Sequence, residues 1–238
     1  MERVQIQLAN AGNELILREG DAASIYERKA FKYSAYSTDS FIQLIKAKAH
    51  KGNAVIAYCD TGIHAIMDDK VFDRDQDRLS YDFKYSQQYS EWESVLGGAA
   101  ADQRSLIKFL KRREPGEVID GELLMAALQN FKFVTNITGD FTYDDNNNYT
   151  FGMKIGDAEG TVRLPQMIYV SIEVFNESGF FQDVEIELEV VKPKSEQEKL
   201  MFTMQCPKLD RYIRAAAEYE INKVKAELDG YLIVTGRI

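Results

Sequence analysis

The chain has 238 residues, of which 45% are hydrophobic and 28% are charged. This composition is typical of a folded protein and excludes collagen-like, low-complexity and wholly disordered chains. No stretch reaches the roughly 18 apolar residues of a membrane-spanning helix, and residues 1–10 lack the apolar segment of a signal peptide. The 29 basic and 38 acidic side chains give a net charge of −9, which disfavours nonspecific binding to nucleic acid but leaves room for a local basic patch.

Residues 1–36 show no clear periodicity, and we expect an N-terminal arm with one short strand or helix around residues 14–17. Such an arm becomes ordered against a neighbouring subunit or partner, or it simply frays at the chain end. The next segment, Ser37-Thr38-Asp39, has the composition of a helix N-cap and predicts a helix in FIQLIKAKAHKG, which Gly52 can close.

Short apolar runs follow this helix. Residues 54–59 and 63–67 flank Asp60-Thr61-Gly62, a spacing that predicts a tight hairpin in which Gly62 adopts a positive φ. Residues 79–85 alternate between apolar and polar side chains and predict a half-buried strand. Apolar residues at helical spacing predict two further helices, over residues 102–113 and 121–130.

After residue 130 the pattern is mainly that of strands. Alternating runs predict six of them, at residues 133–143, 149–155, 161–164, 167–175, 183–191 and 200–206. In the fifth run, Asp183, Glu185, Glu187 and Glu189 face outward; they form either a charged surface that discourages edge pairing or an acidic surface that mimics DNA or meets a protein partner. A helical stripe over residues 209–228 predicts a long helix, and residues 231–234 predict a last strand that returns to a sheet.

The predicted fold class is therefore α+β. An N-terminal α/β portion with the order α-β-β-β-α-α precedes an antiparallel, sandwich-like β portion that carries the long C-terminal helix and the final strand. The corresponding divisions are an arm over residues 1–36, an α/β subdomain over 37–130 and an antiparallel β subdomain over 131–238. Because no linker composition marks residue 130, we expect two interlocked parts of one unit.

The residues with catalytic potential form no recognisable constellation. The sequence contains no G-x-S-x-G, H-E-x-x-H, C-x-x-C or phosphate-binding P-loop motif. A Cys59–His64 thiol–imidazole pair is conceivable across the hairpin, but a cysteine in an apolar strand is usually a small buried hydrophobe. We therefore assign no catalytic residue and no cofactor, and we lean against an enzyme. Two cysteines, Cys59 and Cys206, are too few for a disulfide framework, so we expect reduced thiols and a cytoplasmic location.

Two groups of residues are candidates for binding. Lys108, Lys111, Arg112 and Arg113 form the only concentration of positive charge, and with Trp92 they predict a site that joins phosphate contacts to base stacking. The alternative is that these cations stabilise the end of a helix and that Trp92 anchors the core.

The second group is acidic. Asp60, Asp68 and Asp69 bracket the predicted hairpin near His64, and such carboxylates can hold Mg²⁺ together with substrate phosphate. This predicts a metal site in a hydrolase or nuclease that acts on nucleic acid or nucleotides. The alternative is that Asp60 serves the turn and that the other two belong to a solvated loop.

Three stretches carry a resemblance to a family. TDSFIQLIKAKAHKGNAVIAYCDTGIHAIMDD (38–69), FKYSQQYSEW (83–92) and LEVVKPKSEQEKLMFTMQC (188–206) resemble the YfdQ-like family of uncharacterised bacteriophage and prophage proteins, in the same order over roughly residues 30–238. The resemblance implies a phage or prophage gene that works inside the bacterial host cell, in a family often found beside replication and recombination genes. It implies no activity and no site residue.

The expected function is that of a non-enzymatic phage accessory protein that acts by binding, in phage DNA metabolism or in counter-defence against the host. We expect a homo-oligomer whose partner is a protein, a nucleic acid or a nucleotide, and no association with a membrane. The alternatives are the metal-dependent hydrolase or nuclease and a single-stranded nucleic-acid binder.

Overall fold

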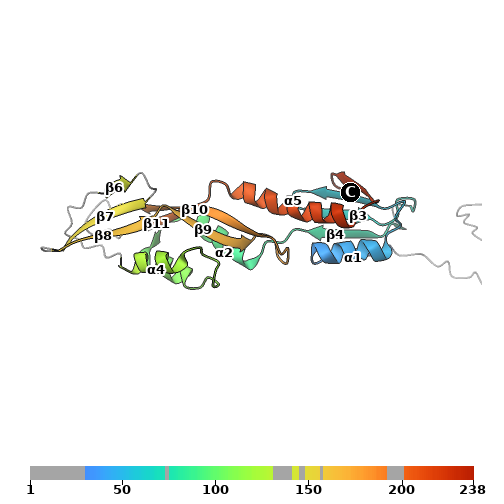
Figure 1. Cartoon of the computed structure of the whole chain (residues 1–238). Coiled ribbons are helices and arrows are strands. Elements are labelled where there is room, and N and C mark those ends of the chain that lie inside the picture. The colour runs from blue at the N-terminus through green and yellow to red at the C-terminus, as the bar shows by residue number, and fades with distance from the viewer. Residues whose placement is uncertain (1–29, 73–74, 131–140, 145–147, 156–157, 192–200) are drawn as a thin grey trace, which may run out of the picture.

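The computed structural model describes residues 30–72, 75–130, 141–144, 148–155, 158–191 and 201–238, with only the backbone between 141 and 163. Its elements form two bodies arranged end to end, and the long helix α5 (Leu209–Glu227) runs from one to the other (Figure 1). The short element expected around residues 14–17 lies outside the described residues. No helix in the described ranges is long and apolar enough to cross a membrane.

The first body is a five-stranded mixed sheet with helices on one face. Its order is β1 (Lys32–Ser34), β4 (Arg78–Asp82), β3 (Gly62–Ile66), β2 (Val55–Cys59) and β12 (Leu232–Thr235). The two outer strands, β1 and β12, pair in parallel with β4 and β2, whereas the three central strands are antiparallel. The last strand of the chain therefore returns to the sheet that the first strands build.

Helix α1 (Thr38–Lys48) covers that sheet and confirms the predicted helix. The Ser37 hydroxyl accepts a hydrogen bond from the amide of Ser40, which satisfies one of the free N–H groups at the helix start. The buried residues Phe41 and Ile45 face the core. The helix ends at Lys48, four residues before Gly52, so the predicted closing role of that glycine is wrong.

The predicted hairpin is present as β2 and β3, but the reason for its glycine differs from the prediction. Gly62 does not have a positive φ. A Cβ atom at this position would lie 2.5 Å from the carbonyl oxygen of Tyr81 on the neighbouring strand. Glycine is therefore required because β4 approaches closely, not because of the turn conformation.

The second body combines two antiparallel sheets with three helices. The four-stranded sheet has the order β5 (Ala101–Asp102), β11 (Met201–Gln205), β10 (Phe181–Val191), β9 (Met167–Glu173), and the three-stranded sheet has the order β6 (Phe141–Asp144), β7 (Asn148–Ile155), β8 (Ala158–Pro165). The helices are α2 (Gln87–Leu96), α3 (Gln103–Leu110) and α4 (Gly121–Asn130). The α+β class is confirmed, whereas β1, α2 and β5 are absent from the predicted order.

Strand β10 confirms the predicted alternation, with Val184, Ile186 and Leu188 buried. The strand lies between β9 and β11, so it is central in its sheet. Its acidic residues therefore do not guard a sheet edge, and Glu185 instead forms an ion pair with Lys208. The reading of this stripe as edge protection is wrong, because the sequence does not show which strands lie on either side of it.

Helix α5 belongs to both hydrophobic cores. Ala216 and Ala217 pack in the core of the second body, while Val224 and Leu228 pack in the core of the first. Phe83, in the segment after β4, contacts both cores. Each core thus draws on residues from both sides of residue 130.

A series of aromatic rings continues this connection. Tyr81 packs edge-on against Phe83 with 5.5 Å between ring centroids, and Phe83 stacks on Phe175 at 4.9 Å. Tyr85 stacks on Phe175 at 5.6 Å and on Tyr89 at 4.5 Å. The rings run from β4 to α2, and each pair adds about 0.5 to 1.5 kcal/mol beyond its buried area.

Glu220 lies on α5 between the two halves of the helix. Its side chain is buried, and neither carboxylate oxygen has a hydrogen-bond partner among the described residues. The hydroxyl of Thr38 is also buried and makes no well-aligned hydrogen bond, but it interacts with the Glu220 carboxylate and lowers its pKa by less than burial raises it. Burial raises the pKa of Glu220, and burial together with the Glu220 charge raises the pKa of Tyr81 to about 12. Lys223, which forms an ion pair with Asp39, also lowers the pKa of Glu220, but burial outweighs this effect.

We predict that Glu220→Gln stabilises the protein at pH 8 and has little effect at pH 4. Because the folded-state pKa exceeds that of an unfolded glutamate (about 4.3), folding favours the protonated form, and the free energy of unfolding of the wild type falls as the pH rises through the folded-state pKa. A neutral amide removes this loss, which amounts to about 1.4 kcal/mol for each unit by which folding raises the pKa. Urea denaturation at both pH values measures it. Exposed Glu218→Gln is the control, and parallel pH profiles for wild type and Glu220→Gln would contradict the prediction.

Candidate nucleic-acid interface

The predicted basic cluster begins on α3. The Asp102 carboxylate caps this helix by accepting a hydrogen bond of 2.7 Å from the amide of Ser105. Leu106 and Leu110 are buried on one side. After the last helical residue, the amide of Arg112 still donates to the carbonyl of Phe109, at 3.1 Å. The helical path therefore continues through the basic run that follows α3.

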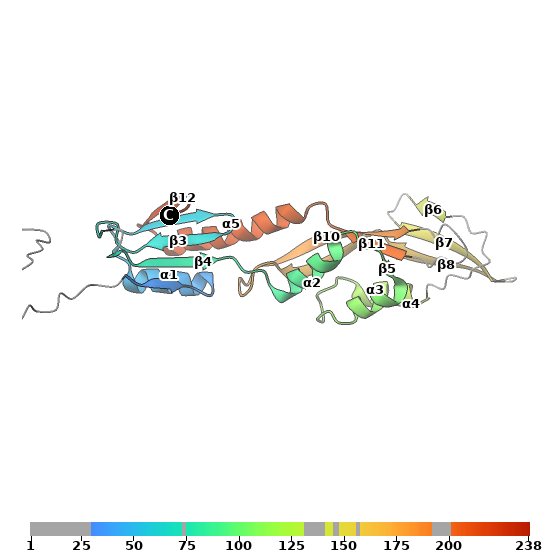
Figure 2. The ribbon, with the colours of Figure 1, turned by 180° about the vertical axis from the view of Figure 1, so that it is seen from behind.

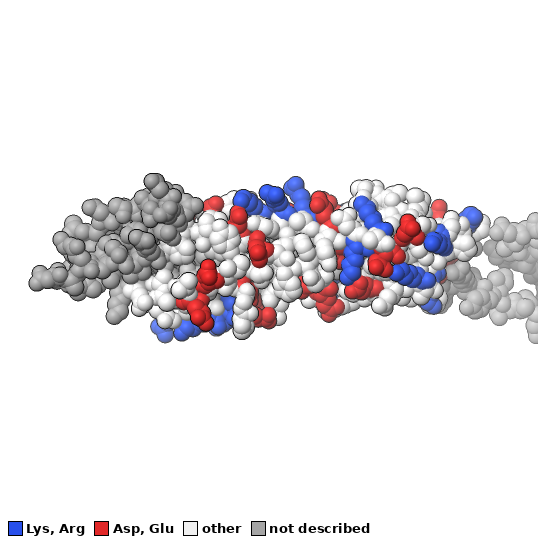
Figure 3. Space-filling model, in the orientation of Figure 1, with Lys and Arg blue, Asp and Glu red and all other residues white. Residues whose placement is uncertain are grey.

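Four cations share the opposite, exposed side of this path. They are Arg104, Lys108, Lys111 and Arg112, here called the α3 basic face. Their spacing of four, three and one residues keeps them within about one third of the helix circumference. No carboxylate in the described part of the chain lies within ion-pair distance of any of the four. Figure 3 shows Lys and Arg side chains gathered along the lower edge of the molecule, below α4.

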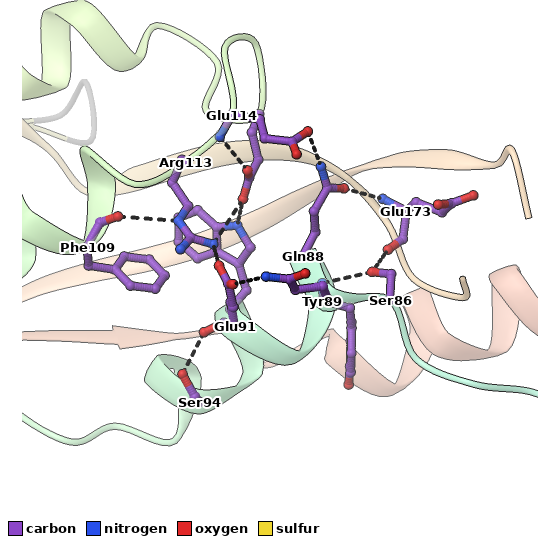
Figure 4. A network of polar contacts seen from close by, with 12 residues as sticks. Ser86, Gln88, Tyr89, Glu91, Ser94, Phe109, Arg113, Glu114 and Glu173 are labelled. Atoms are coloured by element: carbon purple, nitrogen blue, oxygen red, sulfur yellow. Dashed lines mark hydrogen bonds and ion pairs between the residues drawn. The ribbon is translucent and has the colours of Figure 1, made fainter. Parts of the chain in front are cut away.

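Arg113, the last residue of the basic run, is buried in a network of polar contacts (Figure 4). Its guanidinium forms ion pairs with Glu91 and, at 3.5 Å, with Glu117. Its Nε donates to the carbonyl of Phe109, and the group lies 4.4 Å from the centroid of that ring. Hydrogen bonds from Gln87 and Arg113 lower the pKa of Glu91. Arg113 is thus engaged inside the protein and is not available to a phosphate.

Trp92 lies in the same network and is fully buried. Its indole Nε1 donates to Oε1 of Glu117 at 2.6 Å, and the ring packs edge-on against Phe109 with 4.9 Å between centroids. Oε2 of Glu117 accepts from the amide of Glu114 at 2.8 Å. Trp92 therefore offers no ring face to a nucleic-acid base, and its position is that of a core anchor.

The network continues from α2 to the edge of the four-stranded sheet. Nε2 of Gln88 donates to Glu114 at 3.0 Å, and its Oε1 accepts from the amide of Glu173 at 3.5 Å. The Ser86 hydroxyl caps α2 by accepting from the amide of Tyr89 and donates to the carbonyl of Glu173. These contacts join α2 and the segment after α3 to β9. They hold in place the backbone that carries Lys111 and Arg112 of the α3 basic face.

The structure brings together three of the five residues predicted for this site, Lys108, Lys111 and Arg112, and adds Arg104. The sequence contained a signal for Arg104, because it precedes Lys108 by one helical turn. An exposed face of this kind binds phosphate by charge, and such binding is weakened by salt.

The predicted metal ligands do not come together. Asp60 lies in the turn between β2 and β3, whereas Asp68 and Asp69 follow the other end of β3, about 15 Å of strand away. The Asp68 carboxylate accepts a hydrogen bond from the amide of Lys70 in its own loop. Within the described residues, no three His, Cys, Asp or Glu side chains are placed to hold a metal ion.

The two cysteines are free, as expected. The Cys59 thiol lies 3.2 Å from the hydroxyl of Thr61, its hydrogen-bond partner in place of the conceivable His64. Partial burial raises the pKa of this thiol, but contacts with Thr61 and Arg237 outweigh it and lower the pKa overall. Burial raises the pKa of Cys206.

No family model, curated protein or solved structure matches this chain. The resemblance to the YfdQ-like proteins therefore stays a prediction from the sequence.

We predict that Arg113→Met destabilises the protein by about 3 kcal/mol or more, because it leaves the buried Glu117 carboxylate without its cation. Arg112→Met, which removes the same charge from the neighbouring exposed residue, should change the free energy of unfolding by less than about 0.5 kcal/mol. Guanidinium denaturation of both variants measures the difference. Equal effects of the two substitutions would show that the Arg113 network does not stabilise the fold.

Proposed function

We propose that the chain is a bacteriophage or prophage accessory protein that binds the phosphate backbone of single-stranded nucleic acid through the α3 basic face. The observation that carries the proposal is the set of four exposed cations on one side of α3, none of them paired with a carboxylate of the described residues. The phage setting rests on the sequence resemblance. Within that setting, the proposal favours DNA metabolism over counter-defence.

The net charge of −9 does not oppose this function at physiological salt. Charges separated by more than about 8 Å of solvent are largely screened at 0.15 M ionic strength. A phosphate in contact with Lys108 or Arg112 therefore interacts mainly with the α3 basic face and only weakly with remote acidic residues.

The expected mode is phosphate contact without base stacking at Trp92, because that ring is buried. Binding of this kind tolerates any base sequence and has dissociation constants of roughly 1 to 100 μM. It differs from sequence readout, which needs contacts to base edges.

We predict that a fluorescently labelled oligothymidylate binds the wild type and that Lys108→Glu with Lys111→Glu weakens binding at least tenfold at 50 mM salt. Each lost phosphate contact reduces the slope of log K against log salt by about 0.7, so two lost contacts reduce it by about 1.4. Fluorescence anisotropy between 50 and 200 mM salt measures both quantities.

The matched control is Arg211→Glu with Arg214→Glu, which makes the same change in net charge on exposed residues of α5. If both double variants weaken binding equally, the effect belongs to net charge and not to the α3 basic face. Absence of wild-type binding at 100 μM and low salt would reject the function.

A further inference from the structure

The side of β12 that faces away from β2 is a second candidate binding surface. β12 is the last strand of the five-stranded sheet and, among the described strands, pairs only with β2. Figure 2 shows it at the upper border of that sheet. Helices α1 and α5 cover one face of the sheet, and the side of β12 away from β2 is a sheet edge.

The backbone of β12 has a known polarity. The amide of Gly236 donates to the carbonyl of Tyr58 on β2, at 2.9 Å. Because successive residues of a strand point their N–H and C=O groups to opposite sides, Val234 also faces β2, and Ile233 and Thr235 present their backbone groups to the free edge. The strand therefore offers two donors and two acceptors to another strand.

The side chains beside this edge are apolar. Leu232 is 58% exposed and Val234 is 37% exposed, both on the face of the sheet opposite the helices. Ile233, on the other face, packs against the core of the first body. The sequence of β12, Leu-Ile-Val-Thr, contains neither a charge nor a proline.

The other edge of the five-stranded sheet, β1, and both edges of the four-stranded sheet, β5 and β9, are protected. β1 has only three residues and begins with Lys32, and β5 has only two residues. At β9, the amide of Ser171 donates to the carbonyl of Glu117, and the amide of Ile119 donates to the carbonyl of Tyr169. Proteins protect free edges by short strands, charges or covering loops, and β12 has only its modest length of four residues.

We infer that β12 pairs antiparallel with β12 of a second copy of this chain about a two-fold axis. Placing Ile233 opposite either Ile233 or Thr235 of the second copy aligns the outward-pointing backbone groups of both strands. Both registers also bring the exposed Leu232 and Val234 side chains of the two copies together on one face. The five strands of each copy then form one continuous sheet.

A second copy suits this edge because a two-fold interface requires a surface that complements itself. The edge of β12 complements itself, because its backbone offers both donors and acceptors and its exposed Leu232 and Val234 side chains are apolar. The strand carries no charge that would repel its own copy. An unrelated strand or residues 1–29 of the chain would need only to complement this edge, and they are the competing occupants in the test.

Sedimentation velocity of the full chain between 1 and 100 μM tests the inference. We expect a dimer whose population falls at least tenfold in Val234→Lys, which places the two new like charges directly opposite each other in the Ile233–Thr235 register and on neighbouring positions of the same face in the Ile233–Ile233 register. The same loss is expected in Ile233→Pro, which removes only an N–H group that points away from β2. The control is Leu123→Lys, at a side chain that is 71% exposed on α4 of the second body. It should dimerise as the wild type does, and circular dichroism confirms that each variant is folded.

If a variant fails to fold, hydrogen exchange on the wild type alone tests whether β12 forms the dimer interface. The peptide that covers residues 231–236 should exchange more slowly at high than at low protein concentration, because dimerisation protects the amides of Ile233 and Thr235. A wild type that stays monomeric at 100 μM overturns the inference. A dimer that persists in both variants, with unchanged exchange over residues 231–236, also overturns it and indicates another occupant or another interface.

Discussion

The architecture depends on one helix that serves two hydrophobic cores. α5 has 19 residues, about 28 Å of helix, and it packs Ala216 in one core and Val224 in the other. The aromatic series that passes through Phe83 and Phe175 gives a second connection beside it. Both connections bury apolar side chains against each of the two bodies. Neither body alone would bury all of α5 or the whole aromatic series. Glu220 lies on α5 between the residues that pack in the two cores. Its buried carboxylate therefore lowers the stability of the helix that both cores share.

The same arrangement gives adjacent residues of one basic run different environments. Arg112 and Arg113 are adjacent, yet one is exposed and the other is buried between Glu91 and Glu117. The buried arginine joins α2 to the segment after α3, and this fixes the backbone that carries the exposed cations. Charge that stabilises the fold and charge that is available to a ligand therefore differ by one residue. The difference depends on which acidic groups α2 and the loop bring within reach.

The sequence predicted those features that depend on neighbouring residues. The cap at Ser37, the hairpin of β2 and β3 and the stripe of α5 are local, because each depends on a turn, a periodicity or a capping side chain. Helix α2 was missed because its buried residues Tyr89 and Trp92 stand in a polar context that hides their helical spacing. The neighbours of β10 and the burial of Arg113 depend on contacts between distant segments. No local pattern contains that information, which is also why a stacking role for Trp92 stayed open beside the favoured interpretation as a core anchor.

The two proposed surfaces lie on different bodies, and this has a consequence for how they would work together. Pairing through β12 uses the edge of the first body and leaves α3, on the second body, outside the interface. A dimer would then carry two α3 basic faces at a separation set by α5 and the aromatic series. A single strand that reaches both faces makes its second contact within one complex, so its affinity rises without any new type of contact. If both proposals hold, two sets of four cations held on one dimer would bind a long strand more tightly than either set alone.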